Sequence, residues 1–197
     1  MVWGFFHEIG RKIIHITILI VLAVYFFIEN NNGKQIALLF LVALLILFLV
    51  LEYFRLELGW KMPFFSQFIR AKEDNRMYGV IYFLSASIIS LAVFDKKIAL
   101  AALLMTTFGD MVAALVGKRY GTTLIYRNKT WAGFIAEIIV NLIVGFIVLG
   151  GTSGGIYIIL GMASVATVVE TMVDELDDNL IIPLFAGFIG QIILFSL

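Results

Sequence analysis

The sequence contains no cysteine, and only 14% of its 197 residues are charged. The lack of cysteine excludes disulfides, thiolate zinc sites and cysteine nucleophiles. The chain also lacks both common glycine-rich nucleotide motifs, G-x-x-x-x-G-K-[ST] and G-x-G-x-x-G, so any nucleotide site must be built differently. Its net charge is zero, which gives no support for nucleic-acid binding.

Hydrophobic residues make up 62% of the chain, and the mean hydropathy is +1.05. Both values are typical of a polytopic membrane protein. Apolar segments of about 17 to 25 residues can cross a bilayer, and here they predict an all-α membrane helix bundle of about seven spans in one domain, residues 1–197; six or eight spans remain possible. The expected spans are 12–28, 35–54, 78–94, 97–117, 131–150, 155–173 and 180–197.

The Lys and Arg residues divide unevenly between the two sets of loops. With the N-terminus inside, eleven of the fourteen lie on the inner side, and only Lys34, Lys96 and Lys97 lie outside. The positive-inside rule therefore predicts an integral membrane protein with a cytoplasmic N-terminus. The acids also gather inside, except for Glu29 and Asp95. Chemistry on a cytosolic substrate would gather them there, so we expect the active site to face the cytoplasm.

The stretch from Phe108 to Ala136 carries the most informative charges. It places Asp110 inside an apolar helix, Lys118 and Arg119 at the end of that helix, and Lys129 just before the next helix. An ionisable side chain within the hydrocarbon layer costs about 2.5 to 3.5 kcal/mol, so it is rare without a partner or a task. This stretch predicts a phosphate and metal site at a membrane surface.

Small residues predict how the two helices of this stretch pack. Gly109, Ala113 and Gly117 recur every four residues, which leaves one helix face nearly bare and lets a neighbouring backbone approach closely. In the following helix, Glu137 and Asn141 lie on one stripe with Gly133 and Gly145 at its ends. Such a stripe must face protein or a wet cavity. Its polar residues are either functional groups or interhelical hydrogen bonds that hold the bundle together.

An acidic run follows the sixth expected span. That span ends with Thr167, Glu170 and Asp174 on one face, and residues 177–179 continue the polar run. Acidic runs are usually solvated loops. Because this inner loop contains no cation, we expect a positive partner, either bound Mg²⁺ or the Lys and Arg of the loop between the fourth and fifth spans. Carboxylate oxygens suit Mg²⁺, which also binds phosphate oxygens.

A second basic group precedes the first span. Arg11 and His15 lie four residues apart on one helical face, with Lys12 beside them. A lone histidine is often a hydrogen-bonding core residue. Next to Arg11 at the inner interface it can equally contact phosphate.

Together these motifs resemble the family of dolichol kinases, phytol kinases and CTP-dependent diacylglycerol kinases. The resemblance covers nearly the whole chain. It is carried by Arg11-Lys12-x-x-His15, Gly109-Asp110, Gly117-Lys118-Arg119-x-Gly121, Lys129-Thr130-x-x-Gly133, and Glu170 with Asp177-Asp178-Asn179-x-x-x-Pro183. It implies transfer of the γ-phosphoryl group of CTP to the hydroxyl of a membrane lipid. We expect a polyprenol or dolichol-type acceptor or a shorter prenyl alcohol, with diacylglycerol as an alternative.

The resemblance also implies roles for individual residues. Expected nucleotide contacts are Arg11, Lys12, Gly109, Gly117, Lys118, Arg119, Gly121, Lys129, Thr130 and Asn179. Expected Mg²⁺ ligands come from Asp110, Glu137, Glu170, Asp174 and Asp178. Expected catalytic residues are Asp110, Asp178 and His15. The partners would be CTP, a lipid alcohol and the bilayer, with a homodimer possible.

Two other functions compete with the kinase. Lys129-Thr-Trp-Ala-Gly-Phe134 also looks like a segment of some CDP-lipid synthases (cytidylyltransferases), but the C-terminal signature of those enzymes is missing. An ion-coupled transporter could use Asp110, Glu137 and Glu170 as a relay. Against a transporter, the charges cluster at one face and the outer face offers no matching exit.

Overall fold

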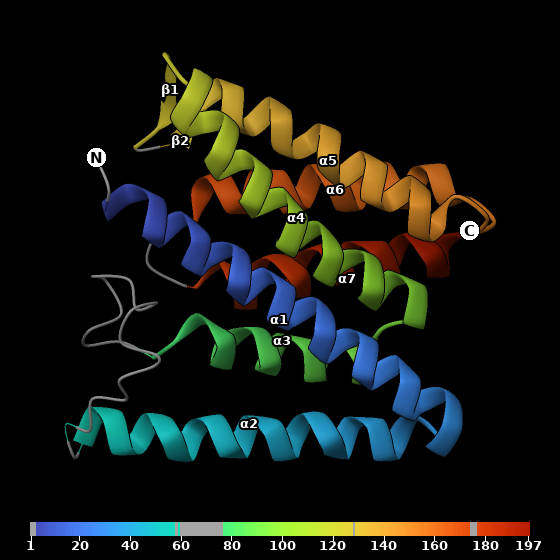
Figure 1. Ribbon diagram of the computed structural model, residues 1–197. Helices are drawn as coiled ribbons and strands as arrows, with labels where there is room; N and C mark the ends of the chain where they lie inside the picture. Colours follow the sequence, from blue (N-terminus) through green and yellow to red (C-terminus); the bar gives the residue numbers. More distant parts are fainter. Residues whose placement is uncertain (1–2, 58, 60–76, 128, 174–176) are drawn as a thin grey trace. The chain divides into compact units, whose positions relative to one another are not determined.

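A computed structural model describes residues 3–57, 59, 77–127, 129–173 and 177–197, with side chains from residue 18 onward. The described residues form seven helices and one two-stranded hairpin (Figure 1). The helices are α1 (Trp3–Asn32), α2 (Lys34–Glu57), α3 (Gly79–Val93), α4 (Lys96–Tyr120), α5 (Trp131–Leu149), α6 (Gly155–Met172) and α7 (Asp178–Ser196). The strands are β1 (Leu124–Tyr126) and β2 (Lys129–Thr130).

Five of these helices, α2, α4, α5, α6 and α7, are long and apolar enough to cross a membrane. The protein is therefore an integral membrane helix bundle, as the hydropathy predicts. Helix α3 has 15 residues and a length of roughly 22 Å, which is shorter than the hydrocarbon layer. For α1, the apolar part with described side chains is Ile18–Asn32. A total of seven spans and a cytoplasmic N-terminus stay predictions.

The chain divides into two compact units, Met1–Ile88 and Ile89–Leu197. In the first unit, α1 packs along α2. Near the end of α2, Glu52 is only 3% exposed. Its Oε1 accepts hydrogen bonds from Arg55 Nη2 at 2.7 Å and from the Tyr78 backbone N–H at 3.1 Å. Arg55 also lies 4.2 Å from the centre of the Tyr78 ring. This cluster satisfies a buried carboxylate and ties the end of α2 to the start of α3.

The second unit contains α4 to α7. Helix α4 packs along α5, α5 along α6, α6 along α7, and α7 back along α4. The interior contains fully buried apolar side chains, among them Leu103, Met105, Ile159 and Met162. Short connections join successive helices, so neighbours run in opposite directions.

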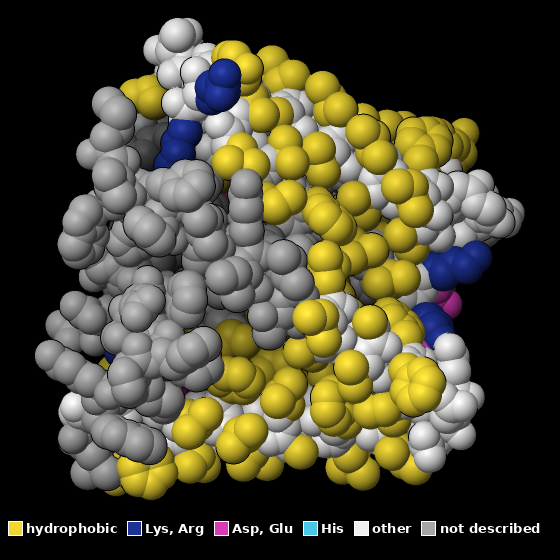
Figure 2. All heavy atoms as spheres, in the orientation of Figure 1, with side chains coloured by type: hydrophobic (Ala, Val, Ile, Leu, Met, Phe, Trp, Pro, Cys, Tyr) yellow, Lys and Arg dark blue, Asp and Glu magenta, His cyan; other side chains and the backbone are white. Residues whose placement is uncertain are grey.

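The outward face of α5 is apolar. Ile135, Ile139, Ile143 and Ile147 recur every four residues and are all exposed. Yellow hydrophobic side chains cover much of the described surface of α4 and α5 in Figure 2, and dark blue Lys and Arg side chains appear near the helix ends. A continuous apolar face of this kind suits contact with lipid.

Helices α4 and α5 approach each other through the small residues that the sequence places on facing stripes. A Cβ added to Gly133 would lie 2.9 Å from the carbonyl oxygen of Ala113, and one added to Gly117 would lie 3.0 Å from Thr130 Oγ1. The close approach expected from these residues is confirmed. It brings the Asp110 and Glu137 helices together at the candidate site.

Gly133→Ala should therefore lower the stability of the protein by about 1 to 3 kcal/mol, because the new methyl group meets a backbone oxygen that cannot turn away. Thermal unfolding in detergent measures the effect. The matched control is Gly151→Ala, since a Cβ there has no neighbour within 4 Å. Equal unfolding temperatures for the two variants would contradict the packing argument.

The connection between α4 and α5 was expected as a loop with Lys and Arg residues. It contains a short hairpin, in which Leu124–Tyr126 pairs antiparallel with Lys129–Thr130. Ile125 and Tyr126 supply a local β-strand preference, and Arg127 turns the chain with a φ of 47°. The described part of the chain is all-α apart from this hairpin. Its strand β2 carries Lys129 back toward the helices.

Candidate phosphate and metal site

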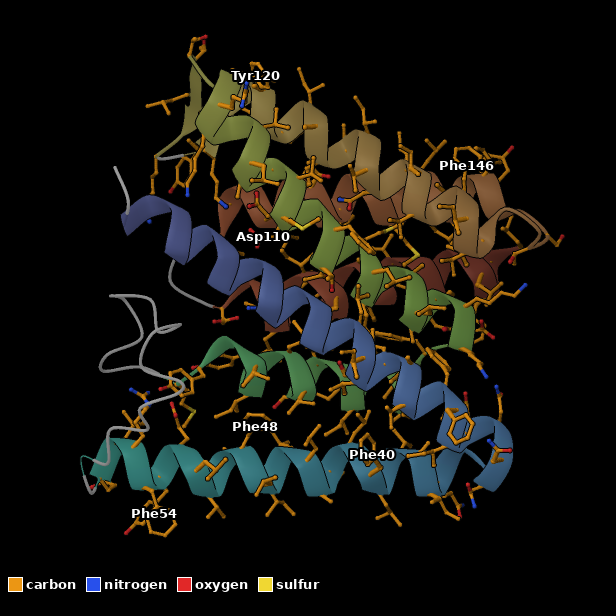
Figure 3. All side chains as sticks on the ribbon, viewed as in Figure 1. Phe40, Phe48, Phe54, Asp110, Tyr120 and Phe146 are labelled. Carbon is orange, nitrogen blue, oxygen red and sulfur yellow. The ribbon has the colours of Figure 1, made fainter. Side chains whose placement is uncertain are left out.

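One end of the second unit gathers the polar segments that the sequence singles out. Because successive helices are antiparallel, the end of α4, the hairpin, the start of α5, the end of α6 and the start of α7 share that end (Figure 1). Asp110 lies in the half of α4 nearer this end, and Tyr120 marks the end itself (Figure 3). The fold thus collects side chains that lie far apart in the sequence.

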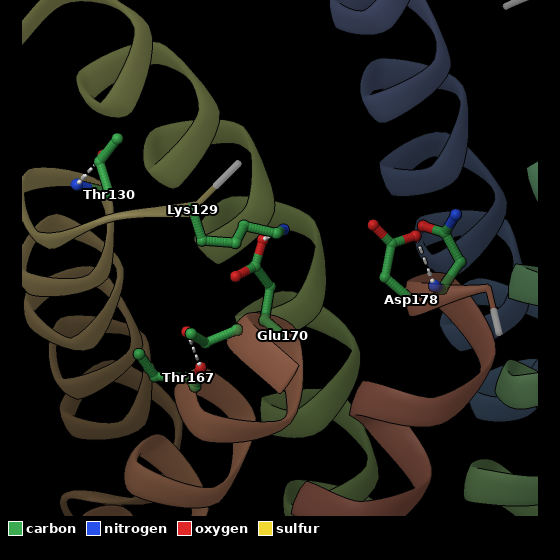
Figure 4. A network of polar contacts seen from close by, with 8 residues as sticks. Lys129, Thr130, Thr167, Glu170 and Asp178 are labelled. Atoms are coloured by element: carbon green, nitrogen blue, oxygen red, sulfur yellow. Dashed lines mark hydrogen bonds and ion pairs between the residues drawn. The ribbon is translucent and has the colours of Figure 1, made fainter. Parts of the chain in front are cut away.

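The centre of this end is an ion pair between Lys129 Nζ of β2 and Glu170 Oε1 of α6 (Figure 4). Glu170 is only 4% exposed, and Lys129 is 36% exposed. The acidic run was expected to need a positive partner, and for Glu170 that partner is a lysine of the loop between the fourth and fifth spans. Burial alone would lower the pKa of Lys129, but the charges of Glu170, Asp110 and Asp178 outweigh burial and raise it above 10.5. Lys129 is therefore fully charged at neutral pH.

More carboxylates surround this pair. Asp110 of α4 and Asp178 at the start of α7 both interact electrostatically with Lys129. Glu137 of α5 is 1% exposed and interacts with Glu170, Lys129 and Asp110. One Lys thus lies among acids from four different helices. Four of the five predicted metal ligands thus interact electrostatically with Lys129.

Asp178 and Asn179 are held in place by a helix cap. The side chain of Asp177 accepts hydrogen bonds from the backbone N–H of Asn179 at 3.0 Å and from Asn179 Nδ2 at 2.9 Å. Asp178 Oδ1 accepts from the same backbone N–H at 3.0 Å. An acidic first turn is favourable at a helix N-terminus, so the Asp-Asp-Asn run is fixed locally before any ligand binds.

Several residues expected at the nucleotide also have packing roles. Thr130 caps α5, its Oγ1 accepting a hydrogen bond from Gly133 N at 3.2 Å. Gly121 ends α4, its N–H donating to Gly117 O, and a Cβ at Gly121 would lie 2.6 Å from Thr130 Oγ1. These contacts explain the glycines and Thr130 by packing alone, and their contact with nucleotide stays a prediction.

The two cations at the end of α4, Lys118 and Arg119, are both exposed. They lie in the last turn of the helix, where cations are favourable. The Arg119 guanidinium lies 5.6 Å from the centre of the Tyr120 ring. Exposed cations at the same end of the unit as Lys129 can receive the outer phosphates of a nucleotide.

Four of the predicted residues have no described side chain. Asp174 is outside the described residues. Arg11, Lys12 and His15 are in α1 of the first unit, in the part described without side chains. Their roles stay predictions.

The described carboxylates suit a metal ion that arrives with a phosphate ligand. Within residues 18–57, 77–127, 129–173 and 177–197, no three His, Asp or Glu residues are grouped closely enough to hold a metal ion by themselves. Mg²⁺ rarely needs such a cage, because it binds one or two carboxylates together with phosphates and water. Glu137 Oε2 is a buried oxygen that has no hydrogen-bond partner among the described residues, so it could ligate a cation. The residues present therefore fit Mg²⁺ bound jointly with nucleotide.

One contact of the site could not be read from the sequence. Asn141 Nδ2 of α5 donates a hydrogen bond to Thr167 Oγ1 of α6 at 3.0 Å. Spacing along α6 places Thr167 on the face of Glu170, but it does not say which helix lies opposite. Asn141 was expected to be either a functional group or an interhelical hydrogen-bond partner, and the structure supports the hydrogen bond.

Comparisons with known proteins point to one family. CTP-dependent diacylglycerol kinase 1 of Saccharomyces cerevisiae is 32% identical over 73% of this chain and 51% of its own length. Phytol kinase 1 of Arabidopsis thaliana is 29% identical over 57% of this chain and 42% of its own length. The chain belongs to the dolichol, phytol and CTP-dependent diacylglycerol kinase family. The family resemblance of the motifs is thereby confirmed.

The extent of similarity differs among members of this kinase family. The chain spans about half the length of the curated kinases that it matches. An uncharacterized protein of Methanocaldococcus jannaschii is 30% identical over 92% of both chains. No protein-family model matches the chain, and no solved structure matches it.

Proposed function

We propose that this protein is a CTP-dependent lipid kinase that transfers the γ-phosphoryl group of CTP to a lipid hydroxyl and releases CDP. The observation that carries the proposal is the Lys129–Glu170 pair, surrounded by Asp110, Glu137 and Asp178. Phosphoryl transfer requires positioning and charge neutralisation more than covalent chemistry. Lys129 and the surrounding carboxylates, at one end of a membrane bundle, can position the phosphates and neutralise their charge.

The proposed roles follow from charge and position. Lys129, Lys118 and Arg119 hold the phosphates of CTP. Asp110 and Glu137, with contributions from Glu170, Asp174 and Asp178, hold Mg²⁺, which when bound neutralises charge on the β- and γ-phosphates. The lipid oxygen forms a bond to the γ-phosphorus while the bond between that phosphorus and the β–γ bridging oxygen breaks. A carboxylate, with Asp178 and Asp110 as the candidates, accepts the hydroxyl proton.

Before CTP binds, the charge of Lys129 is paired with that of Glu170. Glu170 is the ion-pair partner of Lys129 and is also a proposed ligand of Mg²⁺. When phosphate oxygens reach Lys129, Glu170 becomes available to the metal. The same pair can therefore bind nucleotide and metal together.

The acceptor is a lipid alcohol, and two classes compete. A prenyl-type alcohol is favoured by the motifs and by the phytol kinase relatives. Diacylglycerol is favoured by the yeast relative, which is 32% identical over 154 residues. We propose the prenyl-type alcohol as the first candidate and diacylglycerol as the second. The site would face the cytoplasm, where CTP is present.

The kinase should pass label from γ-labelled CTP, and not from α-labelled CTP, into the organic phase. A kinase and a CDP-lipid synthase share the nucleotide and basic residues, so binding cannot separate them, but they differ in which phosphorus is attacked. The purified full-length chain is assayed with Mg²⁺ and, in parallel, polyprenol, a phytol-like alcohol or diacylglycerol.

A reaction without lipid is the control for labelled by-products. Label from the α position together with released pyrophosphate would instead identify a CDP-lipid synthase. If no acceptor became labelled from γ-labelled CTP, although each lipid alcohol was supplied in excess, the kinase proposal would be contradicted. The acceptor that accumulates labelled monophosphate decides between the two classes.

A further inference from the structure

Asn141 is an amide at the centre of the second unit. It is 0% exposed, and its Nδ2 donates to Thr167 Oγ1 across the α5–α6 interface at 3.0 Å. Its Oδ1 has no hydrogen-bond partner among the described residues. A buried amide that is only half satisfied costs free energy. Such a residue in a membrane helix calls for a reason beyond filling space.

The same amide also touches α4. A Cβ added to Gly109 would lie 2.7 Å from Asn141 Oδ1 and 3.3 Å from Asn141 Nδ2. The amide thus occupies the space that the missing side chain of Gly109 leaves. Asn141 therefore contacts α4 and α6 from α5.

Each contact of the amide lies close in sequence to a carboxylate of the site. Asp110 follows Gly109 directly, Glu137 precedes Asn141 by one helical turn, and Glu170 follows Thr167 by three residues. These three acids come from three different helices. A shift of the amide would change the spacing among all of them.

We infer that Asn141 is a positioning residue, which holds α4, α5 and α6 at the spacing where one or two of the carboxylates of Asp110, Glu137 and Glu170 bind the cation together with the phosphates of the nucleotide. This inference rests on the proposed function. Groups that orient metal ligands without touching the metal typically change its affinity by about 10- to 100-fold when removed. A residue that only holds helices together would lower stability and leave cation affinity unchanged.

The test titrates Mg²⁺ at fixed CTP and follows the unfolding temperature of the purified full-length chain in detergent. Thr167→Val removes the hydroxyl that binds Asn141 and keeps the shape, whereas Thr167→Ser keeps the hydroxyl. The matched control is Thr106→Val, since Thr106 is also buried and its hydroxyl donates to the carbonyl of Ala102 in its own helix. Gly109→Ala displaces the amide from the opposite side and gives an independent variant.

Thr167→Val and Gly109→Ala should raise the Mg²⁺ concentration for half-maximal stabilisation about 10-fold, while Thr167→Ser and Thr106→Val stay near the wild-type value. A lower unfolding temperature without Mg²⁺, combined with an unchanged Mg²⁺ midpoint in both variants, would overturn the positioning role and leave the proposed kinase intact. A wild-type chain that neither responds to Mg²⁺ with CTP nor phosphorylates a lipid would overturn the proposed function and this inference together.

Discussion

Asp110→Asn should lower the turnover of lipid phosphorylation by at least about 100-fold, the usual loss when one charge-stabilising group of an active site is removed. Asp110 lies in the half of α4 nearer the site, and it interacts electrostatically with Lys129 and Glu137. Asparagine keeps the shape of the side chain and removes its charge. The measurement is the initial rate of labelled lipid formation at saturating CTP.

The matched control is Asp95→Asn at the other end of the same helix. Asp95 caps α4 by accepting a hydrogen bond from the backbone N–H of Lys97 at 2.9 Å, and asparagine caps helices equally well. Both variants should unfold within about 3 °C of the wild type, because neither changes packing volume. Near-normal turnover of Asp110→Asn would remove Asp110 from the set of metal ligands.

Most of the secondary structure could be predicted because a bilayer imposes one strong rule on the chain. A spanning segment must satisfy its backbone internally and present apolar side chains over its whole length. Long apolar runs therefore mark helices, and the observed bounds of α4 and α5, Lys96–Tyr120 and Trp131–Leu149, differ from the expected ones by only a few residues. The hairpin escaped prediction because strands of three and two residues leave too little periodicity to detect.

The site was predictable in part, because helical spacing shows which residues share a face. Glu137 and Asn141 were expected on one buried stripe, and both are buried. Spacing cannot show which helix covers that stripe. The contacts of Asn141 with Thr167 and Gly109 needed the packing of three helices, and the choice of Lys129 as the partner of Glu170 needed the hairpin that returns it to the bundle.

The second large effect concerns the Lys129–Glu170 pair, and we expect its two partners to contribute unequally. Lys129→Met leaves Glu170, Glu137 and Asp110 close together without a cation. Glu170→Gln leaves Lys129 with Asp110 and Asp178 still nearby, and it removes one of the charges that oppose Glu137. The lysine variant should therefore be the less stable of the two.

The expected magnitudes are modest for a buried pair. Breaking a fully buried ion pair from one side costs about 3 to 5 kcal/mol, but Lys129 is 36% exposed, so solvent screens part of that cost. We expect Lys129→Met to lower the free energy of unfolding by about 2 kcal/mol and Glu170→Gln by about 1 kcal/mol. Lys97→Met, at an exposed position of α4, is the control and should change it by less than about 0.5 kcal/mol.

The double variant, Lys129→Met with Glu170→Gln, should be more stable than Lys129→Met alone, because removing both partners leaves fewer uncompensated charges than removing the cation. Its catalysis should not recover. If Lys129 holds the phosphates of CTP, regained stability cannot replace its charge, and lipid phosphorylation stays low in both variants that lack it. Unfolding in detergent and the labelled-lipid assay, run on the same preparations, separate the two roles. Recovery of activity together with stability would show that Lys129 serves only as the counter-ion of Glu170, and the phosphate contacts would then have to come from Lys118 and Arg119.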